Sequence, residues 1–163
     1  MIRRKNIITV AIDSPAAAGA GTIAKFLAKE YNLLYLDTGK IYRLIGKLRL
    51  KNKQKFNYNI IKKKMKKIKT KMFENKDLIE DEVAKSASII AKDIKIRKLI
   101  KNYQHNCGYN PPKKYSGSVL DGRDITSVIM KDAMFKFYIT ANINVRAQRR
   151  YIELKKIKKK NIL

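Results

Sequence analysis

The chain has 163 residues, of which 45% are hydrophobic, so it is long enough for one compact domain with a buried core and global disorder is not expected. Its single cysteine, Cys107, excludes an intramolecular disulfide framework and favours a cytoplasmic location. Lys and Arg outnumber Asp and Glu by 39 to 13, and the formal charge of +26 favours polyanionic partners such as nucleotides, nucleic acid or an acidic membrane surface.

The first forty residues predict the start of a βαβ unit. Ile7 to Ile12 is a short run of mainly β-branched apolar residues, typical of a buried strand and too short to span a bilayer. Small residues follow at positions 16–21, and from Thr22 the apolar residues recur with a helical period. A strand, a small-residue loop and a helix in this order open an α/β unit.

The same alternation continues along the chain. A second strand is predicted at 33–36, followed by a helix that has Ile41, Leu44, Ile45 and Leu48 on one side. Amphipathic helices are expected from Asp81 to about 91 and from about 96 to 103, where Asn110-Pro111-Pro112 then breaks the chain. Third and fourth strands are predicted at 118–121 and 135–139, and a basic helix from about 144 to 163. We therefore predict an α/β fold with a parallel sheet and helices on both faces.

The segment from 47 to 71 is the most basic part of the chain, with twelve Lys and Arg residues and no acidic residue. A partial helical stripe in it consists of Ile60, Ile61, Met65 and Ile68. Such a segment can bind a polyanion. Codon bias in an AT-rich genome offers a second explanation, because most of the excess charge is lysine and accompanies many Ile and Asn residues.

The loop between the first strand and helix has some features of a phosphate-binding loop. Such a loop wraps phosphates with backbone N–H groups, places a helix N-terminus behind them and adds a lysine. In nucleoside monophosphate kinases it reads Gly-Pro-x-x-x-Gly-Lys-Gly/Ser-Thr. This segment keeps Pro15, Gly19 and the pair Gly21-Thr22, but it has Ser14 for the first glycine and Ala20 for the lysine. Taken alone, the segment could also be a plain small-residue turn.

Three further segments carry a family resemblance. Residues 34–43 (LYLDTGKIYR) resemble the signature Y-L-D-T/S-G-x-x-Y-R, and residues 119–125 (VLDGRDI) resemble V-x-D-G-R-D-I. Residues 142–151 are similar to the R-A-x-R-R-Y segment that opens a lid. The spacing of Glu82-Val83, Ala87-Ser88, Ile96-Arg97 and Gln104 agrees as well. The chain therefore resembles, in order and almost from end to end, the bacterial cytidylate kinases of the P-loop nucleoside monophosphate kinase family.

The resemblance implies ATP-dependent phosphoryl transfer to CMP or dCMP. Arginine forks hold phosphates well, and a carboxylate can accept hydrogen bonds from the amine of cytosine. Considered without the other motif residues, Arg43 could also be a solvated helix residue. The implied acceptor-binding residues are Asp37, Thr38, Tyr42, Arg43, Arg123 and Asp124.

The implied donor site comprises the loop, a magnesium ion and the arginines that balance the charge of the transferring group. Taken alone, Asp121-Gly122 could also be a turn after a strand. The implied ATP-binding residues are Ser14, Pro15, Ala16, Ala17, Ala18, Gly19, Ala20, Gly21 and Thr22; Mg²⁺ would be held by Thr22 and, through water, Asp121; the catalytic residues would be Arg123, Arg149 and Arg150.

Four departures from the family pattern qualify these expectations. Ala20 and Ser14 alter the loop, Ile79 stands where the family has an arginine used on cytosine, and the family continues beyond the position of Leu163. We therefore expect one three-layer P-loop kinase domain over 1–163 without the family's final strand and helix. It would have a reduced, helical CMP-binding insert at about 47–80 and the start of a lid at about 146–163, and it would be a monomer.

Two alternatives stay open. The chain could be a decayed or truncated member that keeps the kinase fold with little catalysis, an expectation based on Ala20 and on the early stop at Leu163. It could instead be a nucleic-acid-binding module built on its lysine-rich segments, although this leaves the motifs at 37–43 and 121–124 without a purpose.

Overall fold

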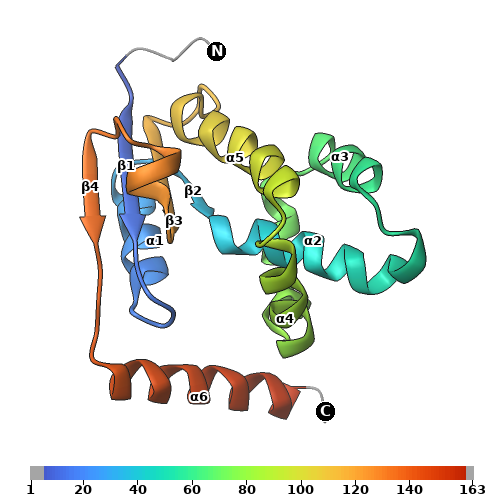
Figure 1. Ribbon diagram of the computed structural model, residues 1–163. Coiled ribbons are helices and arrows are strands. Elements are labelled where there is room, and N and C mark those ends of the chain that lie inside the picture. The colour runs from blue at the N-terminus through green and yellow to red at the C-terminus, as the bar shows by residue number, and fades with distance from the viewer. Residues whose placement is uncertain (1–5, 161–163) are drawn as a thin grey trace.

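The computed structural model describes residues 6–160, with the backbone alone at residues 54, 76 and 156–160. The last residues of the expected lid segment, 161–163, lie outside the described part. Four parallel strands form one sheet in the order β2-β3-β1-β4 (Figure 1). They are β1 (Ile8–Asp13), β2 (Leu33–Asp37), β3 (Gly117–Gly122) and β4 (Phe135–Tyr138). The predicted α/β class and parallel sheet are confirmed.

Six α-helices surround the sheet in the described part of the chain: α1 (Ala20–Glu30), α2 (Thr38–Asn52), α3 (Tyr58–Lys66), α4 (Asp81–Ile90), α5 (Ile94–Tyr109) and α6 (Ile143–Lys160). Helix α5 begins two residues before the predicted start, because the Asp93 side chain caps it by accepting a hydrogen bond from the Ile96 backbone N–H at 3.0 Å. Helix α1 likewise begins at Ala20 rather than at Thr22, directly after a left-handed Gly19.

Short helical turns complete the structure. Three of them, η1 (Lys53–Lys55), η2 (Thr70–Glu74) and η3 (Lys76–Ile79), lie with α3 in the segment expected to be a reduced insert. Ile61, Met65 and Phe73 of this segment are buried in the same apolar cluster as residues of α2, α4 and α5. A fourth turn, the π-helical η4 (Ile125–Ile129), follows β3 and has no signature in the sequence.

The sheet separates two apolar layers. Val10 and Ile12 of β1 pack with Ala20 and Ala24 of α1, whereas the intervening Ala11 belongs to the cluster formed with α2, α4 and α5. Successive side chains of a strand point to opposite faces, so a continuous apolar run is what a sheet covered on both sides requires. The chain therefore forms three layers, with helices on both faces of the sheet (Figure 1).

Within residues 6–160, every helix is either too short or too polar to cross a membrane.

Candidate functional site

The carboxyl ends of the strands bring three aspartates to one edge of the sheet. Asp13 ends β1, Asp37 ends β2, and Asp121 of β3 lies directly beside Asp37 in the parallel register. In open parallel sheets this edge is where ligands bind. Helix α6 runs past the same end of the molecule, below α1 and the lower end of α4 in Figure 1.

Asp13 is buried and anchors the turn that follows β3. Its carboxylate accepts hydrogen bonds from the Ile125 N–H at 2.7 Å and from the Thr126 N–H at 3.0 Å, and a third from the Thr126 hydroxyl at 2.5 Å. These three bonds fix the start of η4, and with it the side chain of the preceding Asp124.

The loop from Ser14 to Gly19 connects β1 to the N-terminus of α1. It is tied to β3 by a hydrogen bond from the Ser14 N–H to the Gly122 carbonyl at 3.0 Å. Ala17 (φ 59°) and Gly19 (φ 103°) are left-handed, which lets the loop turn into the first turn of α1. Ser14, which replaces a family glycine, has no positive φ, so its side chain introduces no left-handed strain.

Position 20, where the family has lysine, carries a buried alanine. Ala20 is only 3% exposed and packs with Val10, Ile12 and Ala24 on the α1 side of the sheet. The loop itself therefore supplies backbone N–H groups and a helix N-terminus but no cation.

Two arginines of α6 contact this loop directly. The Arg146 Nε donates to the Ala16 carbonyl at 2.9 Å, and the Arg149 Nη1 donates to the Ala18 carbonyl at 3.1 Å and to the Ala17 carbonyl at 3.4 Å. The neighbouring Arg150 faces the other way.

Arg150 joins α6 to α4 instead of to the loop. It forms ion pairs with Asp81, at the start of α4, at 3.0 Å and with Glu153 at 2.7 Å. Helix α6 therefore spans the loop and the region beside α4.

Asp121 is half-buried at the same edge of the sheet. Burial, followed by repulsion from Asp37, raises its pKa to about 7, although hydrogen bonding by the Tyr35 hydroxyl opposes the shift. Its Oδ1 atom is buried without a hydrogen-bond partner among the described residues, and its Oδ2 lies 3.5 Å from where a Cβ on Gly21 would be. An unpaired carboxylate oxygen beside a phosphate-type loop suits Mg²⁺, which prefers oxygen ligands and is usually held by one or two carboxylates plus phosphates and water.

No cluster of three or more His, Cys, Asp or Glu side chains able to hold a metal occurs within residues 6–160. A magnesium ion here would therefore depend on phosphate and water oxygens for most of its ligands. Thr22, the other residue expected to hold the ion, is exposed in the first turn of α1.

The start of α2 connects the loop region with a pocket that is described below. The Asp37 side chain caps α2 by accepting from the Lys40 N–H, and the buried Thr38 hydroxyl donates to the Asp121 carbonyl at 2.7 Å. One turn later, the half-buried Arg43 donates from Nη1 to the Leu78 carbonyl at 2.8 Å.

The Arg43 guanidinium is surrounded by other charges. Burial and the neighbouring Arg150 lower its pKa, while Asp37, Glu153 and Asp81 raise it. Arg43 and Arg150 therefore lie close enough to repel one another, and an anion between them would relieve that repulsion.

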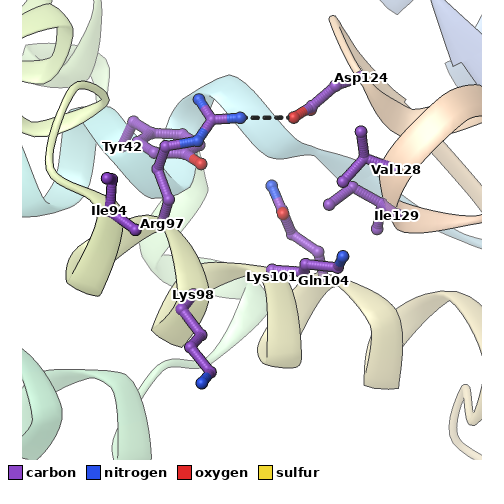
Figure 2. Close-up of a pocket in the computed structure, with 9 residues that line it drawn as sticks. All are labelled: Tyr42, Ile94, Arg97, Lys98, Lys101, Gln104, Asp124, Val128 and Ile129. Atoms are coloured by element: carbon purple, nitrogen blue, oxygen red, sulfur yellow. Dashed lines mark hydrogen bonds and ion pairs between the residues drawn. The ribbon is translucent and has the colours of Figure 1, made fainter.

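A pocket of about 200 Å³ lies between α2, α5 and η4 (Figure 2). This volume is below the roughly 300–1,000 Å³ of pockets for drug-sized ligands, so it suits one small ring. The residues that line it are Tyr42, Ile94, Arg97, Lys98, Lys101, Gln104, Asp124, Val128 and Ile129.

Three polar side chains of this pocket, Arg97, Asp124 and Gln104, can form hydrogen bonds with a ligand. The Arg97 Nη2 pairs with the Asp124 Oδ2 at 2.7 Å, and Figure 2 shows the Gln104 amide directed toward this pair from below. Gln104 is 1% exposed, and its Oε1 has no hydrogen-bond partner among the described residues. Because an unpaired buried carbonyl is costly, this atom indicates a ligand with an N–H group.

The structure brings most of the predicted residues together in two groups. The loop residues lie at the end of β1. Tyr42 and Asp124 line the pocket, whereas Asp37 and Thr38 lie beside Asp121 and Arg43 is bonded to the Leu78 carbonyl. Arg123 is exposed and makes no side-chain hydrogen bond or ion pair with another described residue, and Arg150 contacts acidic residues rather than the loop.

Sequence reasoning expected Arg146 to approach the ATP phosphates, but it assigned no role in the site to Arg97 or Gln104. Arg97 and Gln104 are seven residues apart on α5, two helical turns, so a shared helix face was a readable signal. Their meeting with Asp124 was not readable, because it depends on η4.

Comparison with known proteins identifies the family to which this chain is similar. A family model described as cytidylate kinase matches residues 10–163. The cytidylate kinase of Clostridium tetani is 38% identical over 96% of this chain and 74% of its own length, and that of Clostridium botulinum strain Hall is 38% identical over 91% and 71%. The cytidylate kinase of Rhodospirillum rubrum is 35% identical over 90% of this chain and 69% of its own length.

Proposed function

The chain belongs to the cytidylate kinase family of nucleotide phosphotransferases, and from that premise we propose that it transfers the γ-phosphoryl group of ATP to CMP or dCMP in the cytoplasm. The observation that supports this acceptor best is the pocket of Arg97, Asp124 and Gln104, which suits the polar edge of a cytosine ring.

Cytosine presents an amine donor beside two acceptors, N3 and O2. The carboxylate of Asp124 and the unpaired Oε1 of Gln104 can each accept from the amine, and the Arg97 guanidinium can donate to the ring acceptors. Uracil has a carbonyl oxygen in place of the amine, which would face these two acceptors without a proton between them. The pocket therefore favours CMP over UMP, and Arg97 gives it a guanidinium despite the loss of arginine at Ile79.

The acceptor phosphate would lie toward the loop, near Arg43 and Arg123. Arg43 is held by its bond to the Leu78 carbonyl in η3, so we further propose that residues from about 47 to 80 form the reduced CMP-binding insert. Thr38 links this side to the donor side through its bond to Asp121.

Transfer needs two anionic groups held in line. An oxygen of the CMP phosphate forms the new bond to the γ-phosphorus as the bond to the β,γ-bridging oxygen breaks, which gives CDP and ADP. No strong general base is required, because the attacking phosphate oxygen already carries charge at neutral pH. The chain's task is positioning and charge balance, which Arg43, Arg123 and the arginines of α6 would supply.

Mg²⁺ bound near Asp121 and Thr22 would neutralise charge on the β- and γ-phosphate oxygens. Asp121 suits this role because its Oδ1 has no hydrogen-bond partner among the described residues.

A family member that folds but turns over slowly is a second candidate, and the specific observation behind it is Ala20. Losing one preorganised charge-stabilising contact typically costs about 10²–10³ in rate. This would reduce the phosphoryl-transfer rate but leave CMP binding intact.

A coupled assay of ADP release with ATP and Mg²⁺ tests the proposed acceptor. We expect CMP or dCMP to stimulate ADP release and AMP to have no effect, with UMP weaker than CMP. Asp124→Asn should lose most of the CMP preference, because the amide offers an N–H group to the cytosine amine. Equal stimulation by CMP, UMP and AMP would contradict the proposal.

A further inference from the structure

The loop lacks its own cation, yet it is not without a positive charge. In the described part of the chain, the charged side chains that donate hydrogen bonds to the loop carbonyls are Arg146 and Arg149, both from α6. They lie more than 120 residues from the loop in sequence. Charge has therefore been brought to the loop by tertiary folding rather than by the loop sequence.

Arg149 lies close to the position of the absent lysine. Its Nη1 would be 3.5 Å from a Cβ placed on Gly19, the residue immediately before Ala20, and it bonds to the Ala17 and Ala18 carbonyls. Both bonds are donated by Nη1, one of three guanidinium nitrogens, so donors remain for a phosphate oxygen. These two hydrogen bonds also hold the Arg149 side chain in place. Less conformational entropy would therefore be lost when a phosphate binds.

The other cations of this region are less well placed. Arg146 contacts Ala16, at the exposed side of the loop, and Arg150 is paired with Asp81 and Glu153. Lys25 is exposed on α1, and it lowers the pKa of Asp121.

We propose that Arg149 replaces the loop lysine in this chain, supplying from α6 the cation that binds the donor phosphates. A small residue is sufficient at position 20, because the positive charge reaches the loop from α6 and not from the first turn of α1. The kinetic consequence rests on the proposed function, whereas the binding consequence does not.

Binding of inorganic tripolyphosphate, measured by titration calorimetry without Mg²⁺, tests the proposal independently of catalysis. Arg149→Gln should weaken tripolyphosphate binding about 10- to 100-fold, the usual effect of losing a charge-assisted bond. Arg149→Lys should retain most of the affinity. Lys155→Gln is the matched control, since it removes one exposed positive charge from the same helix and should change the affinity less than twofold.

A lysine returned to position 20 gives the sharper test. Ala20→Lys should restore most of the tripolyphosphate affinity of Arg149→Gln, but add less than threefold when Arg149 is present. If the parent enzyme transfers phosphate to CMP, kcat should follow the same pattern, falling about 10²–10³-fold in Arg149→Gln and recovering in the double variant. Thermal melting of each variant shows whether it is folded.

The proposal is overturned if Arg149→Gln binds tripolyphosphate as the parent does, or if Lys155→Gln loses as much affinity. It is also overturned if Ala20→Lys raises the affinity by the same factor with and without Arg149. Should Ala20→Lys not fold because position 20 is buried, the comparison of Arg149→Gln with Arg149→Lys decides. A parent that binds tripolyphosphate through Arg149 but transfers nothing to CMP would contradict the proposed function and leave this inference standing.

Discussion

Ionisation of the Asp121 carboxyl group makes the stability of the fold depend on pH. Burial and Asp37 raise its pKa to about 7, well above that of an unfolded aspartate. Between these two values the folded chain holds a proton that the unfolded chain has lost. The contribution of Asp121 to the free energy of unfolding is therefore complete below about pH 4 and is lost as the pH rises to about 7.

Asp121→Asn should remove this dependence. In metal-free buffer, the free energy of unfolding of the variant relative to the parent should rise by a few kcal/mol between about pH 4 and pH 7. Urea unfolding of both proteins at several pH values measures the difference. A constant difference over that range would show that Asp121 titrates normally.

Asp13 has a structural role that the sequence motif did not reveal. Its carboxylate is the acceptor for two backbone N–H groups and one hydroxyl at the start of η4. Asp13→Ala should lower the free energy of unfolding by about 2–4 kcal/mol, because the buried donors lose a charged partner. Glu30→Ala, at the exposed end of α1, is the control and should change it by less than about 0.5 kcal/mol. Equal effects of the two changes in urea unfolding would rule out this anchoring role.

At the scale of the elements, α2 and α4 pack through a glycine. A Cβ on Gly46 would lie 2.8 Å from the Ala87 backbone N and 3.0 Å from the Val83 carbonyl oxygen, and the buried Ser86 hydroxyl donates to the Gly46 carbonyl at 3.1 Å. The two backbones therefore meet where a side chain would separate them.

Gly46→Ala should destabilise the protein by about 1–3 kcal/mol, despite the better helix propensity of alanine. Gly108→Ala in α5 is a matched comparison, because there the new methyl group would meet the flexible side chain of Met130 rather than backbone. Thermal or urea unfolding should show a smaller loss for Gly108→Ala. A stabilised Gly46→Ala would mean that α2 and α4 separate at little cost.

Local patterns were sufficient to predict most elements but not the contacts between them. The β-branched run before Asp13 and the apolar period of α4 are readable without a partner, because each reflects burial of one segment. The pocket joins Arg97 to Asp124 and depends on the bond between Asp13 and Ile125, which are 112 residues apart. The η4 turn itself is irregular, so no periodicity predicts it.

The same reason explains the difference between the arginines of α6. The motif predicted a common role for Arg149 and Arg150, but residues adjacent on a helix point about 100° apart. One reaches the loop and the other reaches Asp81.

At the scale of the whole molecule, the formal charge of +26 should accelerate the capture of anionic nucleotides. The association rate for ATP should fall about tenfold or more between low salt and about 0.5 M salt, because ions screen the field of the protein. Stopped-flow measurements with a fluorescent ATP analogue can follow this. Cytidine, which carries no phosphate, is the control and should bind at a rate independent of salt. A salt-independent rate for ATP would mean that the lysine excess has no part in nucleotide capture.

The chain joins the two halves of the proposed reaction through one sheet edge and one helix. The loop contacts β3 through Ser14, Thr38 contacts the Asp121 carbonyl, and α6 reaches both the loop and α4. Through these contacts the protein would bring the phosphates of ATP and CMP together.

The direct test is whether label passes from [γ-³²P]ATP to CMP. The enzyme concentration is kept above that of ATP. These conditions detect a single turnover and so remain informative if Ala20 makes the reaction slow. We predict labelled CDP that forms only with CMP or dCMP in the parent, and a label transfer in Asp124→Asn that no longer distinguishes CMP clearly from UMP. Label that stays in ATP, or that appears only as inorganic phosphate, would contradict the proposed kinase activity.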